Sequence, residues 1–386
     1  MRQALLIFFS FLLLSSCSRT SNSNIATTEI DLFNNTVMVD DLKDYIQDID
    51  VIRFRNGSSP LFINPKKVLL TNNGFIILSG GQVFSFTKEG EYIGPVGRTG
   101  NGPGEYISIL DICLNDPQNE IWCLNHQNTV LKYNLLDLSH TGTIDSNMRG
   151  ITANAIVPYN KSGFALVFFN PVDPTDFEEQ FYCIKCFDSK GVLKEELFPR
   201  EDFNISISFM SPSIQSQDNN YCLCFSPSSG TFWESKDGQL SPFMSISLGE
   251  KALPYRFAID GKNNPWDRIS DIFNSDYYKC VSSLSYSSSL YYCCAFGQQS
   301  ALYNFIVDKE TGKGIRWRSS RFIMTMPVIA ADKEGFYFAF GGSLPVPKGV
   351  PRPEPDILLK ELAAINNIDL ENEPDPFLFK VRFKIK

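Results

Sequence analysis

One short phrase recurs along this chain and limits its possible folds more than any other feature: a turn residue followed by four to six mostly apolar residues. The six copies are GFIIL from Gly74, NEIWCL from Asn119, GFALVF from Gly163, NYCLCF from Asn220, SLYYCC from Ser289 and GFYFAF from Gly335. They start at intervals of 45, 44, 57, 69 and 46 residues, and a four-stranded propeller blade takes about 40–50 residues. The two longer intervals therefore indicate insertions within a repeated β unit.

A second phrase, a strand followed by a turn, comes after most of these copies. It ends at Gly90 in SFTKEG, at Gly191 in CFDSKG, at Gly238 in WESKDG and at Gly312 in VDKETG. Asp and Gly favour tight turns. A β-sandwich would also contain short strands and glycine turns, but it has no reason to repeat one order of strand and turn at this period. We therefore predict an all-β six-bladed β-propeller, with other all-β folds as the alternative.

The N-terminal residues have the pattern of an export signal. A positive start is followed by the largely apolar run ALLIFFSFLLL from Ala4 to Leu14, which at 11 residues is well short of the roughly 20 needed to span a bilayer. The run ends in LSSC at Cys17, which resembles a bacterial lipoprotein signal, where cleavage leaves a lipid-modified cysteine as the first residue. The alternative is an ordinary export signal with a chance cysteine. Two or more acyl chains on Cys17 would anchor the protein stably to a membrane.

The polar segment after Cys17 and the rest of the chain suggest three parts. The stretch SRTSNSNIATT, from Ser18 to about Thr28, is small and nearly uncharged, so it cannot bury a core and is typical of a flexible tether. We assign residues 1–16 to the signal peptide, 17–45 to the lipidated Cys17 and its flexible tether, and 46–386 to the propeller. The last part is long enough for a large core, and 13% of the chain is aromatic, which favours half-buried strands.

Charge excludes one class of partner. The net charge is −8 and no basic run occurs, whereas phosphate backbones are held by clustered Lys and Arg. We therefore expect no binding to nucleic acid.

A glycine-rich stretch, GRTGNGPGEY from Gly97 to Tyr106, lies between segments that are predicted to be strands. Gly100, Gly102 and Gly104 admit unusual backbone angles, and Pro103 fixes its own φ, so the stretch suits a rigid crossover between blades. A phosphate-binding loop would instead open a helix and carry a Lys-Ser/Thr pair or G-x-G-x-x-G. The flanking Arg98 and Glu105 are either ligand contacts at the channel mouth or a simple charge pair, and the charge pair is favoured.

This loop, together with the strand and turn phrases, resembles NHL-type propeller repeats. It is more similar to the six-bladed β-propeller lipoproteins of Bacteroidetes, whose blades carry a glycine-rich G-P-G-E-[YF] loop of the kind at Gly97 to Tyr106. The resemblance covers most of the chain and is weak over residues 250–285. It implies a propeller and a lipid anchor, but little about function, because these lipoproteins are largely uncharacterised.

The two ends of the predicted propeller suggest how its ring closes. DIDVIRF, from Asp48 to Phe54, and PFLFKVRFKIK, from Pro376 to Lys386, both alternate apolar and polar residues, which is typical of half-buried strands. We predict that the N-terminal strand completes the last blade, so that both edges are paired. Before the last strand, DILLKELAAIN from Asp356 to Asn366 has the apolar spacing of a short helix, and Pro345 to Pro355 is a proline-rich loop.

The cysteines predict packing rather than chemistry. Nine remain after Cys17, an odd number that cannot all pair internally, and most lie in predicted strands, where Cys acts as a small hydrophobe. The C-x-x-C at Cys183 and Cys186 has metal or redox spacing, but its surroundings predict a strand instead of a metal knuckle or a helix N-terminus. One or two disulfides are possible in an exported protein, and the sequence does not choose them.

Catalytic and metal-binding patterns are sparse. His126 and His140 form no ligand pair, no G-x-S-x-G occurs, and the acidic stretch from Asp173 to Glu179 suits a solvated loop. The long insertion includes DGKNNPWDRISD, from Asp260 to Asp271, which fails as a calcium loop because Lys262 stands where an oxygen ligand belongs. In it, Trp266 lies beside Asn263 and Asn264, which suggests a sugar or peptide contact or a tryptophan packed on its own blade. We predict no metal and no cofactor.

Three functions fit this sequence. The first is a non-enzymatic envelope module that binds a glycan, a peptide or a partner protein, and we favour it. The second is a propeller hydrolase or lyase acting on a glycan or peptide at the channel mouth. The third is a structural part of an outer-membrane complex. We expect a lipid-anchored protein on the outer membrane. The resemblance to Bacteroidetes lipoproteins implies acidic residues just after the lipidated cysteine in members that face the cell surface, and CSRTSNSN from Cys17 has none, so we favour the periplasmic face over the cell surface.

Overall fold

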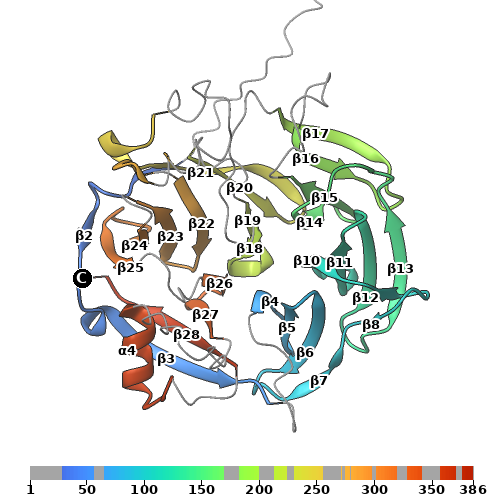
Figure 1. Cartoon of the computed structure of the whole chain (residues 1–386), viewed down its shortest axis with the longest axis horizontal. Coiled ribbons are helices and arrows are strands. Elements are labelled where there is room, and N and C mark those ends of the chain that lie inside the picture. Colours follow the sequence, from blue (N-terminus) through green and yellow to red (C-terminus); the bar gives the residue numbers. More distant parts are fainter. Residues whose placement is uncertain are drawn as a thin grey trace, which may run out of the picture.

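The protein is described by a computed structural model in which strands surround a central axis (Figure 1). The structure describes residues 28–55, 65–168, 182–199, 213–223, 230–254, 271, 274–278, 280–297, 301–319, 328–340, 357–370 and 376–385. The predicted signal peptide, Cys17, the Pro345 to Pro355 loop and the insertion residues Asn263, Asn264 and Trp266 lie outside these residues.

Four sheets of four or five strands form much of the ring. Each has an antiparallel core of four strands in which neighbours in sequence are neighbours in space. The first contains β4 (Pro65–Leu70), β5 (Gly74–Ser79), β6 (Gln82–Thr87) and β7 (Tyr92–Pro95). The second contains β10 (Ile109–Asn115), β11 (Glu120–Asn125), β12 (Thr129–Asn134) and β13 (His140–Asp145). The third contains β14 (Ala155–Tyr159), β15 (Gly163–Val167), β16 (Tyr182–Phe187) and β17 (Leu193–Pro199).

The fourth of these sheets has an added edge strand from the N-terminal region. Its core is β22 (Cys280–Tyr286), β23 (Leu290–Phe296), β24 (Leu302–Asp308) and β25 (Gly314–Ser319), and β2 (Thr36–Met38) pairs with β25 in parallel.

A nine-stranded sheet contains two further antiparallel runs. One run is β18 (Ser213–Gln215), β19 (Tyr221–Leu223), β20 (Thr231–Lys236) and β21 (Gln239–Ser247), with β1 (Thr28–Asp31) parallel to β21. The other is β26 (Val328–Ala331), β27 (Phe336–Phe340), β28 (Phe377–Phe383) and β3 (Ile46–Arg53). Among the described residues, one ladder pair, Gln215 with Ala330, joins the two runs. Elsewhere, β8 (Arg98–Thr99) and β9 (Glu105–Tyr106) form a two-stranded parallel ladder.

The repeated phrases of the sequence fall at matching places in these runs. Every copy of the apolar phrase lies on the second strand of its run, which is β5, β11, β15, β19, β23 or β27. The glycines of the second phrase lie in turns between third and fourth strands. There Gly90, Gly191, Gly238 and Gly312 have φ between 68° and 85°, a region that glycine enters at little steric cost. The prediction of an all-β fold of propeller form is thus confirmed.

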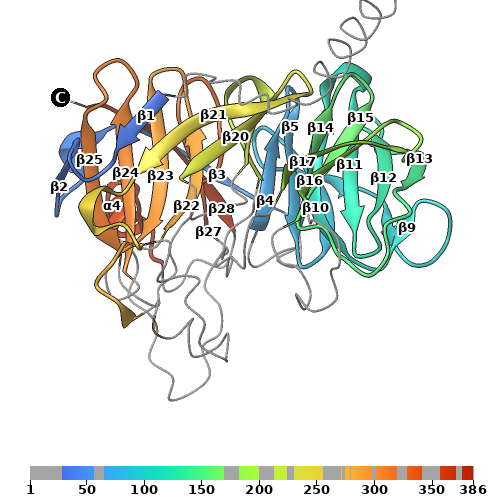
Figure 2. The same cartoon turned by 90° about the horizontal axis from the view of Figure 1, so that it is seen from above.

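The first strands of the runs surround the axis, and the fourth strands lie at the rim (Figure 1). Seen from above, the strands run between two faces of the ring (Figure 2). Turns between first and second strands and between third and fourth strands therefore share one face, which we call the turn face. This face carries the site considered below.

The N-terminal segment runs along the rim and contacts three runs in turn. β1 adds to β21, β2 adds to β25, and β3 pairs with β28 over Asp48 to Arg53 and beyond, as expected for the closing strand. The expected tether reached residue 45, yet strands occupy Thr28–Asp31 and Thr36–Met38 within it. These strands are short, and their backbone groups pair with sheet edges that the local sequence does not reveal.

The short helix and the core follow the apolar pattern. α4 (Ile357–Ile365) lies within the predicted helical stretch and buries Leu358, Leu359 and Leu362. Two 3₁₀ turns, η1 (Lys43–Tyr45) and η2 (Asp116–Gln118), and two more, η4 (Gln217–Asn219) and η5 (Gly249–Lys251), connect strands. Aromatic side chains such as Trp122 and Trp317 are fully buried between sheets.

A buried ion pair joins the first strands near the axis. Lys67 of β4 and Asp111 of β10 are each 1% exposed, and the Lys67 Nζ donates to the Asp111 carboxylate at 2.9 and 3.0 Å. The same ammonium donates to the Ser213 hydroxyl of β18 at 2.5 Å, and Asp111 also accepts the backbone N–H of Ile156 in β14 at 2.9 Å. One carboxylate thus connects four runs across the axis.

Candidate functional site

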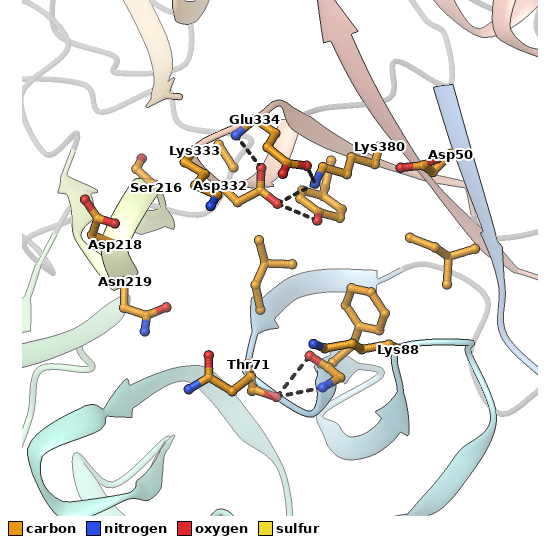
Figure 3. A pocket seen from close by; sticks show the side chains of 17 residues that line it. Asp50, Thr71, Lys88, Ser216, Asp218, Asn219, Asp332, Lys333, Glu334 and Lys380 are labelled. Carbon is orange, nitrogen blue, oxygen red and sulfur yellow. Dashed lines mark hydrogen bonds and ion pairs between the residues drawn. The ribbon is translucent and has the colours of Figure 1, made fainter. Parts of the chain in front are cut away.

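A cavity of about 690 Å³ opens on the turn face. Its walls come from the β4–β5 turn, the β18–β19 turn and the β26–β27 turn, with further side chains from β3, β28 and the β6–β7 turn (Figure 3). Ile52, Leu70, Phe75 and Ala331 add apolar surface to the lining. The volume lies within the ~300–1,000 Å³ that is common for small-molecule sites.

One wall is a network of ion pairs centred on Lys380 of β28. Its Nζ lies 2.8 Å from the Asp332 carboxylate and 2.6 Å from the Glu334 carboxylate, both in the β26–β27 turn. Figure 3 shows these groups pointing toward one another. Arg382, which is not part of the lining, contacts Glu334 at 3.3 Å and pairs with Asp50 of β3 at 2.7 Å. The network therefore joins the cavity wall to the two strands that close the ring.

The turn itself positions Asp332. Its carboxylate accepts the backbone N–H of Glu334 at 2.8 Å and of Gly335 at 3.0 Å, and the hydroxyl of Tyr337 donates to it at 2.8 Å. An aspartate at the start of a turn commonly caps the following N–H groups in this way. Asp332 thus has little freedom to move.

The pKa shifts of this wall follow from its contacts. Burial would raise the pKa of Asp332, but the hydrogen bonds from Lys380, from the turn and from Tyr337 outweigh it, so the pKa is lowered. The hydrogen bond and charge of Lys380, followed by Arg382, lower the pKa of Glu334. Burial and the nearby Asp332 raise the pKa of Tyr337. Both carboxyls are therefore held in the ionised form at neutral pH.

Around the rest of the cavity, several polar side chains have open hydrogen-bonding positions. Asn72 and Lys333 lie at the tips of their turns, and Lys88 lies in the β6–β7 turn; all three are exposed. Within the described part of the chain, these three side chains form no hydrogen bond or ion pair. They offer donors and an amide acceptor to a ligand.

The β18–β19 turn supplies the third wall, and a buried glutamine holds it. Gln215 accepts the N–H of Leu70 at 2.6 Å, donates to the Leu70 carbonyl at 3.1 Å and donates to the Asn219 side chain at 2.5 Å. This bridge fixes the β4–β5 and β18–β19 turns relative to each other. Asp218 is exposed beside them and accepts one hydrogen bond, from Gln217 at 2.9 Å.

The described residues contain neither a metal-binding cluster nor a membrane-spanning helix. Among the described residues, no group of three or more His, Cys, Asp or Glu side chains could hold a metal ion. The ring of His140 contacts Tyr133, and its Nε2 lies 3.0 Å from the Thr143 hydroxyl. No helix within the described ranges has the length and apolar character needed to cross a membrane.

The structure places two of the sequence-predicted contact residues, Arg98 and Glu105, away from this cavity. Arg98 is exposed in β8 and Glu105 is partly buried in β9, and neither lines the cavity. They face each other in the register of the ladder. The favoured charge pair is not present, because no ion pair joins these two described residues. The Glu105 carboxylate instead accepts the backbone N–H of Gly102 at 2.8 Å. Arg98 and Glu105 therefore belong to the loop at the rim, where Figure 1 places β8.

Close approach explains two glycines of this loop. A Cβ on Gly100 would lie 2.1 Å from the Glu105 carboxylate. Gly104 has φ +72°, and a Cβ there would lie 2.7 Å from the ring of His140. Pro103 stands between Gly102 and Gly104 on the exposed side of the loop.

Among the described residues, seven cysteine side chains are buried, and none of them lies in the cavity lining. Their positions are Cys113, Cys123, Cys183, Cys186, Cys222, Cys293 and Cys294. Burial raises the pKa of Cys186 and of Cys222 to about 12. The thiols of Cys186 and Cys222 therefore remain protonated at neutral pH. The C-x-x-C pair lies in β16, as its surroundings predicted.

The cavity was not predicted from the sequence. Its turns lie far apart in the chain, between residues 70 and 334. The one local signal was the repeated placement of a polar turn before each second strand, which put Asn72, Asp218 and Lys333 at corresponding positions.

Fold and cavity together define a class, an all-β protein of propeller-like form with a polar cavity on one face. More particularly, the chain belongs to the family described as a domain of unknown function, DUF4934, whose model matches residues 27–342.

Solved structures provide the second comparison. The chain is similar to a Bacteroides fragilis protein inferred to be exported, with 16% identity and a TM-score of 0.69 over 93% of this chain and 100% of that chain. At 10% identity it also matches U3-55K, with a TM-score of 0.42 over 86% and 98% of the two chains. The WD40 repeats of RRP9 match at 10% identity and a TM-score of 0.41 over 87% and 98%. The first likeness shows the fold alone, and no curated protein matches the chain.

Proposed function

We propose that this protein is an exported, lipid-anchored, six-bladed propeller that acts as a non-enzymatic binding module, with the turn-face cavity as its ligand site. The count of six follows from treating the two runs of the nine-stranded sheet as separate blades. In the part of the chain that the structure describes, the two runs pair through Gln215 and Ala330 alone, whereas strands within each run pair over several residues. All six copies of the apolar phrase then fall on second strands of separate blades.

The N-terminal sequence supports export and anchoring. The apolar run and Cys17 have the order and spacing of a lipoprotein signal. The Bacteroides fragilis neighbour, inferred to be exported, agrees with this location. With Cys17 lipidated, the propeller would be held at the outer membrane on its periplasmic face.

The observation that carries the binding role is the combination of a fixed charged wall and open polar side chains in one cavity. A hydrolytic site of the two-carboxyl type needs one carboxyl with a raised pKa to act as the acid. In this cavity the two carboxyls whose pKa shifts, Asp332 and Glu334, are both shifted downward and held by Lys380. Two ion-paired carboxylates that stay ionised suit recognition better than bond cleavage.

The test uses the intact lipidated protein in its own membranes. Mild crosslinking followed by purification should recover a bound partner or ligand in reproducible amounts, and metabolic labelling with an alkyne fatty acid should mark the protein. Cys17→Ala should abolish the label and release the protein from the membrane.

A cavity variant and a matched control decide whether the cavity is the site. Lys333→Met removes a charge from the lining, and Lys161→Met removes one from the corresponding β14–β15 turn, outside the lining. Loss of the captured molecule in the first variant but not the second supports the proposal. Equal capture by both variants and the wild type would place the binding surface elsewhere.

A further inference from the structure

The charges of the cavity narrow the class of ligand. The lining contains four carboxylates, Asp50, Asp218, Asp332 and Glu334, and three lysines, Lys88, Lys333 and Lys380. Arg382 pairs with two of these carboxylates from outside the lining. Positive and negative charges therefore nearly cancel, and the cavity has no single-sign field that would concentrate a polyanion or a polycation.

The ion pairs also determine which groups a ligand can reach. Lys380 is 11% exposed and already contacts two carboxylates, so displacing it would break a partly buried pair. The groups that remain open are Asn72, Lys88 and Lys333, with free acceptor positions on Asp218 and Glu334. They come from four different turns around the cavity.

Open donors and open acceptors therefore line the same space. A hydroxyl group donates one hydrogen bond and accepts two, so it can bond to a lysine or amide on one side and to a carboxylate on the other. A ligand carrying several adjacent hydroxyls would satisfy these groups without bringing a net charge. Apolar lining from Ile52 and Leu70 would meet the C–H surface of such a ligand.

We infer that the cavity binds a neutral, hydroxyl-rich saccharide. This inference rests on the proposed binding function and gives it a ligand class. Asn72 and Lys333 supply donors on two sides of the saccharide, and Asp218 accepts from its hydroxyls. The Lys380 network acts as a fixed wall that positions these contacts.

A charge series of trisaccharides tests the ligand class by calorimetry on the full mature chain. The neutral probes are cellotriose, maltotriose and mannotriose; the anionic probe is trigalacturonate, and the cationic probe is the glucosamine trimer. At least one neutral trimer should bind, with an affinity that changes less than twofold between 0.05 and 0.5 M salt. Asn72→Ala and Lys333→Met should each weaken it about tenfold, as expected when a ligand hydrogen bond is lost, and Lys161→Met should leave it unchanged.

Other outcomes separate the ligand class from the binding role. Binding of only the charged trimers, or of no trimer at all, overturns the neutral-saccharide inference. If membrane capture still depends on Lys333 in that case, the binding module stands with another ligand. Binding of a neutral trimer that is equally strong in Asn72→Ala, Lys333→Met and Lys161→Met removes the cavity as its site and overturns the inference as well.

Discussion

Two of the lysine–carboxylate clusters in this propeller, one near the axis and one at the cavity, differ in their exposure to solvent. Lys67 and Asp111 near the axis are each 1% exposed. Lys380 at the cavity is 11% exposed, and its partners Asp332 and Glu334 are 29% and 47% exposed. The first cluster has no access to a ligand, whereas the second forms the wall of a cavity. The same pair of side-chain types thus holds the first strands together at the axis and forms part of the cavity wall on the turn face.

The two ion pairs differ in how much of the hydration of their charges is lost on folding. A fully buried charge has lost its water and depends on its partner, so removing one member leaves an uncompensated charge. A pair at a half-exposed wall keeps part of its hydration, and its net contribution is small. The axis cluster should therefore govern folding, and the cavity cluster should govern local geometry and pH response.

The largest effect should come from removing the strand on which the cavity cluster is built. Deleting residues 377–386 removes β28, which pairs with both β27 and β3. β3 would lose its partner, and the edges of β27 and β3 would both be exposed. We expect no cooperative unfolding transition by circular dichroism, whereas a chain ending at Phe383 should keep one. A melting curve equal to that of the full chain in the longer deletion would disprove closure by these strands.

The closing strands show what the sequence could predict. DIDVIRF and the last eleven residues alternate apolar and polar side chains, and this local pattern identified β3 and β28 as partners. The turn glycines and the apolar phrases were likewise local signals, because a strand period and a positive φ leave their mark within a few residues.

Contacts between distant segments could not be predicted in this way. Lys67 and Asp111 are 44 residues apart, and nothing near either residue shows that they meet at the axis. The cavity depends on the relative placement of three turns, which is a property of the closed ring. Arg98 and Glu105 had the chemistry of a site but lie at the rim, because their loop follows the outer strand β7 before the chain reaches β10.

The second largest effect concerns the axis cluster. Asp111→Ala leaves the Lys67 ammonium buried without its partner, so we expect the free energy of unfolding to fall by about 3–5 kcal/mol. Urea denaturation of the full mature chain measures it. The double change Lys67→Met with Asp111→Leu should recover part of the loss, although the N–H of Ile156 also loses its acceptor. A loss below about 1 kcal/mol in the single variant would remove the distinction between the two clusters.

A smaller effect, with a pH dependence, is expected at the cavity. The pKa values of Asp332 and Glu334 are lowered in the folded protein. Their contribution to stability is therefore complete above their unfolded values near pH 4 and is lost as the pH falls through the lower folded values. Asp332→Asn, which can still cap its turn, should cost about 1 kcal/mol at pH 7.

Denaturation at several pH values measures the difference in the free energy of unfolding between wild type and Asp332→Asn. The gap between wild type and Asp332→Asn should stay constant from pH 7 to 5 and narrow below pH 4. A gap that widens on acidification would mean that the carboxyl is stabilised in its protonated form, contrary to the ion pairs described.

The smallest effect should come from Arg382, and salt should reveal it. Arg382 is 22% exposed, and it pairs with Asp48 and Asp50, which are 61% and 50% exposed. Arg382→Gln should lower the free energy of unfolding by no more than about 1 kcal/mol. At 1 M salt, where the screening length is about 3 Å, the difference from wild type should nearly vanish. The loss in Asp111→Ala should persist at the same salt concentration, because a buried pair is screened far less. If both losses responded equally to salt, the axis pair would have to be reached by water and ions, and the contrast between the two clusters would fail.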